Sequence, residues 1–201
     1  ELAVRNQFFT PRYVVEFLTD NTLGRIWYEM TKGETRLADQ CRYLVRRPTE
    51  IFLSDGEEAP QQPEQEGLSQ EELLKQPFYI QCHPYKDPRQ IRLLDPACGS
   101  MHFGLYAFDL FEAIYEEGWE KSIGTLKQDF PDKAEFLVQV PRLIIENNIH
   151  GVDIDPRAVQ IAGLSLWLRA QRSWKNQSVQ PGNRPQIRKS NIVCAEPMPG
   201  D

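Results

Sequence analysis

The chain has 201 residues, of which 40% are hydrophobic and 26% charged, the composition of an ordinary globular protein long enough to form a full core. Its formal net charge of -6 argues against a domain that binds nucleic acid through bulk positive charge, but leaves room for local contacts. No apolar run approaches the length of a membrane span, and the N-terminus lacks the layout of a secretion signal. We therefore expect a cytoplasmic location.

The cysteines show no CxxC pairing; they are Cys41, Cys82, Cys98 and Cys194. Reduced thiols in a cytosolic protein are the favoured interpretation. A zinc site that uses Cys82 and His83 is the weaker alternative.

The first predicted element is a helix from about Pro11 to Met30. Thr10 is a favourable N-cap, and Pro11 suits the first helical position. Apolar residues then recur at near-helical spacing, namely Val14, Val15, Leu18, Leu23, Ile26 and Trp27. We expect a bend near Asn21 or Gly24, and one helix face packed on a core.

Residues 31–90 are predicted to be an insertion or linker that precedes the main sheet. Within it, Arg42, Arg46 and Arg47 interleave with apolar residues. This pattern favours a solvated helix face over the alternative, a contact with a phosphate backbone. The stretch Ser54–Glu66 is rich in acids, Gln and Pro, so it predicts an exposed, mobile loop.

Two short elements close this insertion. Ser69 and Glu72 form a capping-box pattern that predicts a helix to Gln76. The run Phe78–Cys82 predicts a short strand that leads toward the central one.

A strand, turn and helix at residues 91–117 form the centre of the prediction. The apolar run Ile91–Leu94 predicts a buried parallel strand, and His102–Glu117 predicts the helix that covers the sheet. Between them, the small residues around Gly99 allow a tight turn and close approach of a ligand to the backbone. Free amides at the helix start suit an anionic group such as a carboxylate. The alternative is a turn without a ligand. We expect Met30 and Met101 to be core or pocket-lining side chains.

Further helices and strands are predicted in the second half of the chain, with no internal repeat. A helix is predicted at Lys133–Asn148, kinked at Pro141, and a short buried strand at Val152–Ile154. A further helix is expected from Pro156 to about Trp174, with an apolar face made of Val159, Ala162, Leu166, Leu168 and Ala170. A third strand is expected within Gln186–Cys194.

Two acids, Asp95 and Asp153, therefore follow strands at the same edge of a presumed parallel sheet. In nucleoside-binding α/β folds, the first turn holds the charged end of the ligand and the second acid accepts both ribose hydroxyls. Ile154 would lie against the base, and Asn191, near the carboxyl end of the third strand, would bind its polar edge. The long spacing between the acids and the absence of a G-x-G-x-x-G series make NAD a weaker candidate.

Three segments resemble, in this order, amino-group DNA methyltransferases that modify adenine at N6. They are Phe9-Thr10-Pro11, Asp95-Pro96-Ala97-Cys98-Gly99-Ser100 and Gly151-Val152-Asp153-Ile154-Asp155-Pro156. The order is similar to that of type I modification subunits, type IIG restriction-modification enzymes and BREX-like phage-defence methyltransferases.

The resemblance implies S-adenosyl-L-methionine as cofactor and a Rossmann-like class I methyltransferase fold, incomplete in this chain. It implies an N-terminal helical segment at 1–30, an insertion at 31–90 and the N-terminal half of the α/β domain at 91–201. The cofactor-binding residues it implies are Phe9, Thr10, Pro11, Asp95, Pro96, Ala97, Cys98, Gly99, Asp153, Ile154 and Asn191. No metal is implied.

The chain departs from the family at three points. Met101 stands where glycine is common and is expected to narrow the pocket mouth; Asn191 stands where an acid is common. The catalytic Asn/Asp-Pro-Pro-Tyr/Phe segment does not occur in the sequence, and Asp201 lies just upstream of its expected place. We thus expect a cofactor-binding portion that is inactive alone.

Partners implied by the resemblance are double-stranded DNA, through regions mostly outside this chain, and restriction or specificity subunits, with no membrane. Two alternatives stay open: a nucleotide- or NAD-binding α/β enzyme, and a non-catalytic assembly module with a degenerate pocket.

Overall fold

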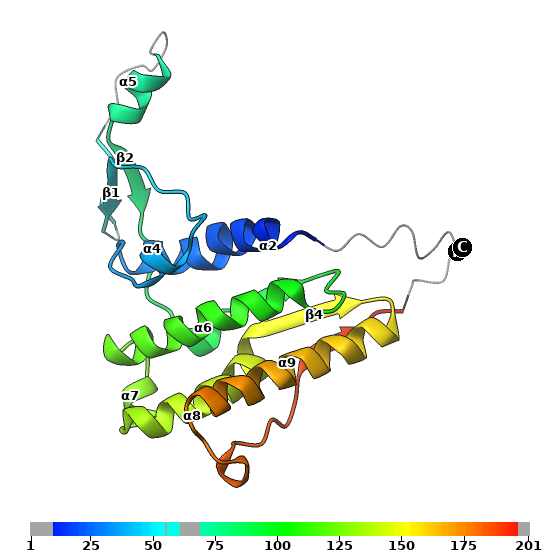
Figure 1. The fold of residues 1–201 in the computed structure, drawn as a ribbon. Helices are drawn as coiled ribbons and strands as arrows, with labels where there is room; N and C mark the ends of the chain where they lie inside the picture. The colour runs from blue at the N-terminus through cyan, green and yellow to red at the C-terminus, as the bar shows by residue number, and fades with distance from the viewer. Residues whose placement is uncertain (1–9, 55, 61–68, 197–201) are drawn as a thin grey trace, which may run out of the picture.

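The computed structural model describes residues 10–54, 56–60 and 69–196 (Figure 1). They form a mixed α/β fold whose main sheet contains β3 (Leu93–Asp95), β4 (Ile149–Asp153) and β5 (Asn191–Cys194). All three strands are parallel, in the order β3-β4-β5. The prediction of an α/β chain with parallel strands is confirmed, although β3 and β5 are shorter than the runs that predicted them.

Helices cover one face of the main sheet. α6 (His102–Glu120) and α9 (Pro156–Asn176) pack against the strands, and α8 (Lys133–Leu143) packs against these two helices (Figure 1). Side chains alternate along a strand, so the neighbours of the core-packed residues point to the opposite face. There, Leu94 and Val193 are 63% and 52% exposed. The sheet therefore has one covered and one open face within the described residues.

The predicted N-terminal helix is present but interrupted. It consists of α2 (Arg12–Thr19), the π-helical segment η1 (Asp20–Gly24) and α3 (Arg25–Met30). The expected irregularity near Asn21 and Gly24 is this π-helical segment. Thr10 is not the N-cap: Pro11 holds that position, with no side-chain cap, and its carbonyl accepts from the amides of Val14 and Val15.

Residues 31–90 contain structure of their own. After α4 (Leu37–Gln40), the chain forms a second, two-stranded parallel sheet from β1 (Glu50–Leu53) and β2 (Phe78–Gln81). Its crossover contains α5 (Gln70–Lys75), and the unit projects from the rest of the fold (Figure 1). The strand expected at Phe78–Cys82 exists, but it pairs with β1 and not with the central strand.

Within residues 31–90, one local prediction is confirmed and another is wrong. The capping box of α5 is confirmed: the Ser69 hydroxyl accepts from the Glu72 amide, and the Glu72 carboxylate accepts from the Ser69 amide. The helix face expected around Arg42, Arg46 and Arg47 is wrong, because the chain between α4 and β1 is a loop. The loop expected at Ser54–Glu66 lies partly outside the described residues.

The second half follows the predicted order with two additions. A short helix, α7 (Leu126–Asp129), precedes α8, and the π-helical segment η3 (Ile144–Asn148) follows it. Pro141 lies inside α8. Short 3-10 turns at η2 (Pro88–Gln90) and η4 (Pro181–Asn183) complete the elements.

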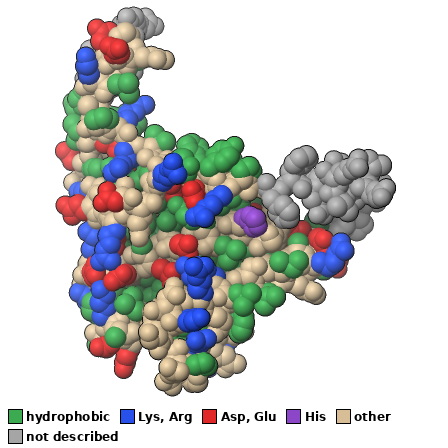
Figure 2. Space-filling model, in the orientation of Figure 1, with side chains coloured by type: hydrophobic (Ala, Val, Ile, Leu, Met, Phe, Trp, Pro, Cys, Tyr) green, Lys and Arg blue, Asp and Glu red, His purple; other side chains and the backbone are tan. Residues whose placement is uncertain are grey.

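The exposed apolar side chains show one error in the predicted helix faces. Leu168, assigned to the buried face of α9, is 52% exposed, and Ile161, Leu164 and Trp167 are similarly open. Hydrophobic side chains are visible in several places on the surface in Figure 2.

None of the described helices combines the length and apolar character needed to cross a membrane. All four cysteines are free thiols.

Candidate functional site

The loop after β3 is tied to the end of β4. The Cys98 amide donates to the carbonyl of Val152 at 3.0 Å. The Gly99 amide donates to Oδ2 of Asp153 at 2.9 Å, across 54 residues of sequence. The register explains the contact, because Asp95 on β3 lies opposite Gly151 on β4. The loop and the acid therefore lie at one edge of the sheet, the carboxyl edge.

Asp153 is held from both sides. Its Oδ1 accepts from the Asp155 amide at 2.9 Å, and its carbonyl accepts from the Ala195 amide beyond β5 at 2.8 Å. Asp155 in turn caps α9 by accepting from the Arg157 amide. Beside this fixed carboxylate, Ile154 is 74% exposed. A carboxylate next to an open apolar side chain is suited to a ligand with hydroxyls and a flat ring.

Asp95 is the least satisfied acid of the site. Its Oδ1 accepts from the Ala97 amide at 3.2 Å, whereas its Oδ2 is buried and has no hydrogen-bond partner among the described residues. Burial raises the pKa of the Asp95 carboxyl, the Ala97 amide opposes this, and the Asp153 charge adds to the rise. A buried acceptor of this kind suits a ligand that brings a hydrogen-bond donor.

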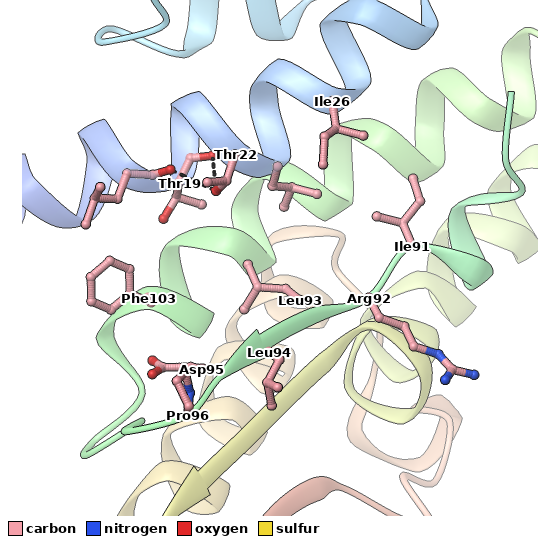
Figure 3. Close-up of a pocket in the computed structure, with 12 residues that line it drawn as sticks. Thr19, Thr22, Ile26, Ile91, Arg92, Leu93, Leu94, Asp95, Pro96 and Phe103 are labelled. Carbon is pink, nitrogen blue, oxygen red and sulfur yellow. Dashed lines mark hydrogen bonds between the residues drawn. The ribbon is translucent and has the colours of Figure 1, made fainter. Parts of the chain in front are cut away.

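A cavity of about 470 Å³ lies between the N-terminal helix and β3 (Figure 3). Asp95 and Pro96 line one end of it, and its walls are mostly apolar. The other lining residues are Leu18, Thr19, Thr22, Leu23, Ile26, Ile91, Arg92, Leu93, Leu94 and Phe103. Its volume falls in the range of small-molecule sites. Sequence reasoning missed these residues; Leu18, Thr22 and Ile26, spaced four apart, form a helix stripe next to the core-facing one.

Cys98 contributes to the site through its backbone. Its side chain is buried, and a Cβ added at Gly151 would lie 3.0 Å from the Cys98 Sγ. The thiol therefore packs beneath β4, where only glycine leaves room for it. Pro96 and Ala97 are exposed on the loop.

The sequence predicts that Met101 narrows the pocket mouth, and this prediction is wrong. Its backbone adopts the left-handed conformation, φ 74°, and its side chain is completely buried. The side chain packs against Gly104 and thus lies in the core beneath the loop. Methionine is accommodated at this left-handed position, where glycine is usually favoured, because the core provides space for its side chain.

Asn191 is not at the carboxyl end of β5; this expectation is wrong. It is the first residue of the strand and pairs with His150, whereas Cys194 pairs with Asp153. Its amide nitrogen donates to the carbonyls of Ile145 and Glu146. The predicted strand begins at Gln186, whereas β5 begins at Asn191, so the prediction places Asn191 too close to the carboxyl end. The exposed acid that does follow β5 is Glu196.

Of the leading motif, Thr10 and Pro11 are described, and neither lines this cavity. Phe9 lies outside the described residues, and Pro11 is exposed. Thr10 lines a second hollow of about 700 Å³ between α2, α6 and α9, together with Arg12, His102 and other residues. The structure thus brings together Asp95, the loop and Asp153, and leaves Thr10 beside the start of α6.

Fold and site define a class: an α/β protein with parallel strands, compatible with a methyltransferase fold, whose carboxyl edge joins a small-residue loop to a fixed acid. No protein-family model matches the chain.

Known relatives make the relationship specific. The chain is 32% identical over 172 residues to the adenine-specific methyltransferase BrxX of Escherichia coli O9:H4, covering 86% of this chain and 11% of that protein. It is 27% identical over 175 residues to the adenine-specific methyltransferase PglX of Lacticaseibacillus casei, covering 86% and 12%. RM.MjaORFECS2P of Methanocaldococcus jannaschii is 34% identical over 113 residues, 55% of this chain and 9% of that protein.

The chain is therefore a homologue of one segment of the adenine-specific methyltransferases, over most of its own length. It spans about a tenth of the length of the curated relatives it matches.

Proposed function

We propose that this chain is the S-adenosylmethionine-binding portion of a site-specific DNA methyltransferase that modifies adenine at N6, in a restriction-modification or phage-defence system. The observation that carries the proposal is the 2.9 Å contact between the Gly99 amide and Asp153, which joins the two acidic strand ends. The proposal includes a Rossmann-like class I fold completed by residues outside this chain, and double-stranded DNA as the substrate.

The side chains of the site fit a cationic cofactor. Asp95 presents a buried oxygen that lacks a donor among the described residues. The ammonium of the methionine moiety would supply that donor, with a charge-assisted bond. The pyrophosphate of NAD or of a nucleotide would instead face two carboxylates and be repelled. This charge pattern favours S-adenosylmethionine over the alternative of a nucleotide-binding enzyme.

Each residue has a proposed role. The Asp153 carboxylate would accept the ribose hydroxyls, since it has acceptor capacity beyond the bonds to Gly99 and Asp155. Ile154 would lie against the adenine ring, and Glu196 takes over the role first assigned to Asn191, binding the polar edge of the base. When bound, the cofactor supplies an electrophilic methyl group.

Methyl transfer itself is proposed to need further residues. The tetrapeptide Asn/Asp-Pro-Pro-Tyr/Phe does not occur in the 201 residues. This segment orients the adenine amine and stacks on the flipped base in the family that the chain resembles. The residues present here would bind and orient the cofactor, and the longer protein would supply catalysis, DNA recognition and any contact with restriction or specificity subunits.

Calorimetry with S-adenosylhomocysteine and with NAD tests the cofactor assignment. We expect the first to bind and the second not to bind. Asp153→Asn should lower the affinity for S-adenosylhomocysteine by at least about tenfold, because each lost charge-assisted hydrogen bond contributes roughly 1.5–3 kcal/mol. Asp39→Asn is a matched control at an exposed position. NAD binding, or a folded sample that binds neither compound, would contradict the proposal and favour an alternative function.

A methyl-transfer assay on plasmid DNA tests the proposal that methyl transfer needs residues outside this chain. The chain of 201 residues should give no turnover. Turnover would show that catalysis does not need a segment from elsewhere.

A further inference from the structure

A group of arginines without acidic partners lies in the loop between α4 and β1. Arg42, Arg46 and Arg47 are exposed, and none of their guanidinium groups forms an ion pair within 4.0 Å in the part of the chain that the structure describes; the Arg47 backbone amide donates to Glu50 at 3.1 Å. Other arginines are mostly paired: Arg12, Arg25, Arg36, Arg89, Arg142, Arg157 and Arg169 each form an ion pair. Basic and acidic side chains are likewise interspersed over the face shown in Figure 2. Three unpaired arginines within six positions of an acidic chain indicate an anionic partner.

The loop is fixed to the N-terminal helix by a side-chain clamp. The Asn21 amide group donates to the carbonyl of Tyr43 at 2.7 Å and accepts from the amide of Val45 at 2.8 Å. Arg25 donates to the Val45 carbonyl at 2.9 Å, and buried Asp20 accepts from the Tyr43 amide at 2.9 Å. A loop held by its backbone at both Tyr43 and Val45 presents its side chains from a defined position.

Aromatic rings hold two of the three guanidinium groups. Arg47 lies over the ring of Phe78 at 4.2 Å from its centroid, and Arg42 over Tyr43 at 5.4 Å. Stacking occupies the flat face of a guanidinium and leaves its N–H groups, which lie in the plane, free to donate. This is the arrangement in which arginine binds a phosphate with least loss of side-chain freedom.

The loop also lies next to the candidate site. Asn21, which holds the loop, is followed directly by Thr22, which lines the cavity beside Asp95. The loop and the cavity therefore lie on adjacent sides of one helix, about 10 Å in diameter. A polyanion bound at the loop would therefore lie against a helical segment that also lines the cavity.

We propose that Arg42, Arg46 and Arg47 bind the phosphate backbone of duplex DNA and hold it beside the cofactor cavity. This inference rests on the proposed function, and it assigns a DNA contact to the insertion at 31–90. Contacts of this type bind without reading sequence, and they depend strongly on salt because phosphate binding releases counterions.

Fluorescence anisotropy with a labelled duplex of about two helical turns, titrated with the 201-residue chain at several NaCl concentrations, tests the proposal. Each phosphate contact changes the slope of log affinity against log salt by about 0.9. We expect the triple variant Arg42→Gln, Arg46→Gln, Arg47→Gln to flatten the slope by about 2 to 3 and to weaken binding at least tenfold at low salt. The triple Arg→Lys variant should keep most of the slope.

A control variant with the same loss of charge, Arg172→Gln, Lys175→Gln, Lys189→Gln, should keep the wild-type slope. Asn21→Ala, which removes no charge, should weaken DNA binding because the loop is released. An unchanged slope in the triple Gln variant, an equal loss in the control, or no duplex binding by the wild type would overturn the proposal.

Calorimetry with S-adenosylhomocysteine separates this inference from the proposed function. All of these variants should bind the compound as the wild type does. If a variant loses S-adenosylhomocysteine binding but keeps the salt dependence of DNA binding, only the cofactor assignment is contradicted. If the arginine variants keep S-adenosylhomocysteine binding and also keep the wild-type salt dependence, only the DNA contact is contradicted.

Discussion

The side chain of Met101 occupies the space that a methyl group on Gly104 would need: a Cβ added at Gly104 would lie 2.8 Å from both Cγ and Cε of Met101. Residue 101 is in the left-handed conformation that usually favours glycine, yet it carries a long, fully buried side chain. The two positions therefore depend on each other, with the glycine placed on the helix so that the methionine can support the loop.

This dependence predicts a non-additive pair of substitutions. Gly104→Ala should destabilise the fold by about 1–3 kcal/mol through overpacking. Met101→Gly should cost about 2–4 kcal/mol, the loss from the cavity being partly offset by relief of the left-handed backbone. Urea unfolding of the double variant should give less than the sum of the two. Strict additivity would mean that the two side chains do not share this space.

Asp95 should make the fold less stable at neutral pH. Burial raises the pKa of this carboxyl above the ordinary value of 3.8, so the folded state holds the ionised form at a cost. That cost is complete well above the raised pKa and is relieved as pH falls through it. Asp95→Asn should therefore raise the melting temperature at pH 7, with a smaller gain near pH 4, while it weakens binding of S-adenosylhomocysteine. Melting curves at the two pH values check this, and an equal gain at both would contradict it.

Glu117 should anchor the N-terminal helix to α6. This buried carboxylate accepts from the Trp27 indole at 2.8 Å, the Thr35 hydroxyl at 2.8 Å and the Arg36 amide at 2.6 Å. Glu117→Leu leaves all three donors without an acceptor, and we expect a loss of about 3–5 kcal/mol.

Urea unfolding followed by tryptophan fluorescence measures this loss. The control is Glu120→Gln, because Glu120 pairs with Arg36 and Lys133 at the surface, where ion pairs contribute about 0–1 kcal/mol. A similar effect of both substitutions would show that Glu117 is not an anchor.

Asn148 should be a second buried anchor, at the end of η3. Its amide donates to the carbonyls of Pro88 and Ile91, both at 2.7 Å, and accepts from the Tyr115 hydroxyl at 2.9 Å. Asn148→Ala should cost about 2–4 kcal/mol, since the Pro88 and Ile91 carbonyls lose the side-chain donor that they share and the Tyr115 hydroxyl loses its acceptor. Tyr115→Phe should cost about 1 kcal/mol, because it removes a single hydrogen bond. Thermal unfolding of the two variants should preserve this order; the reverse order would contradict it.

The parts of the fold that follow from local patterns could be predicted from the sequence. The acids after β3 and β4 could be placed at one edge, because a parallel sheet brings the carboxyl ends of its strands together. Long amphipathic helices such as α6 and the capping box of α5 depend on neighbouring residues, so their signals lie within one window of sequence.

The errors arise where distant residues decide the structure. The strands β1 and β2 have four residues each, too few for an alternating pattern, and their pairing spans a long crossover. Arg42, Arg46 and Arg47 have helical spacing, but Asn21 binds the backbone of their segment, which is a turn followed by an irregular loop. The sequence misplaces Asn191 because this residue, the first of β5, is held by the Ile145 and Glu146 carbonyls within η3, which are distant in the chain.

The π-helical turn at Asp20–Gly24 also bears on how this segment tolerates insertions and deletions. A π-bulge holds one residue more than the same length of α-helix, and each residue of an α-helix accounts for about 100° of rotation. Deletion of a single residue there would leave a regular α-helix of about the same length, so α2 and α3 would keep their register and Trp27 its contact with Glu117. The contacts that depend on the bulge are those of its own residues, Asp20 and Asn21, with the backbone of the loop at Tyr43 and Val45. A one-residue deletion at the bulge should therefore release this loop while it leaves the anchor at Glu117 in place.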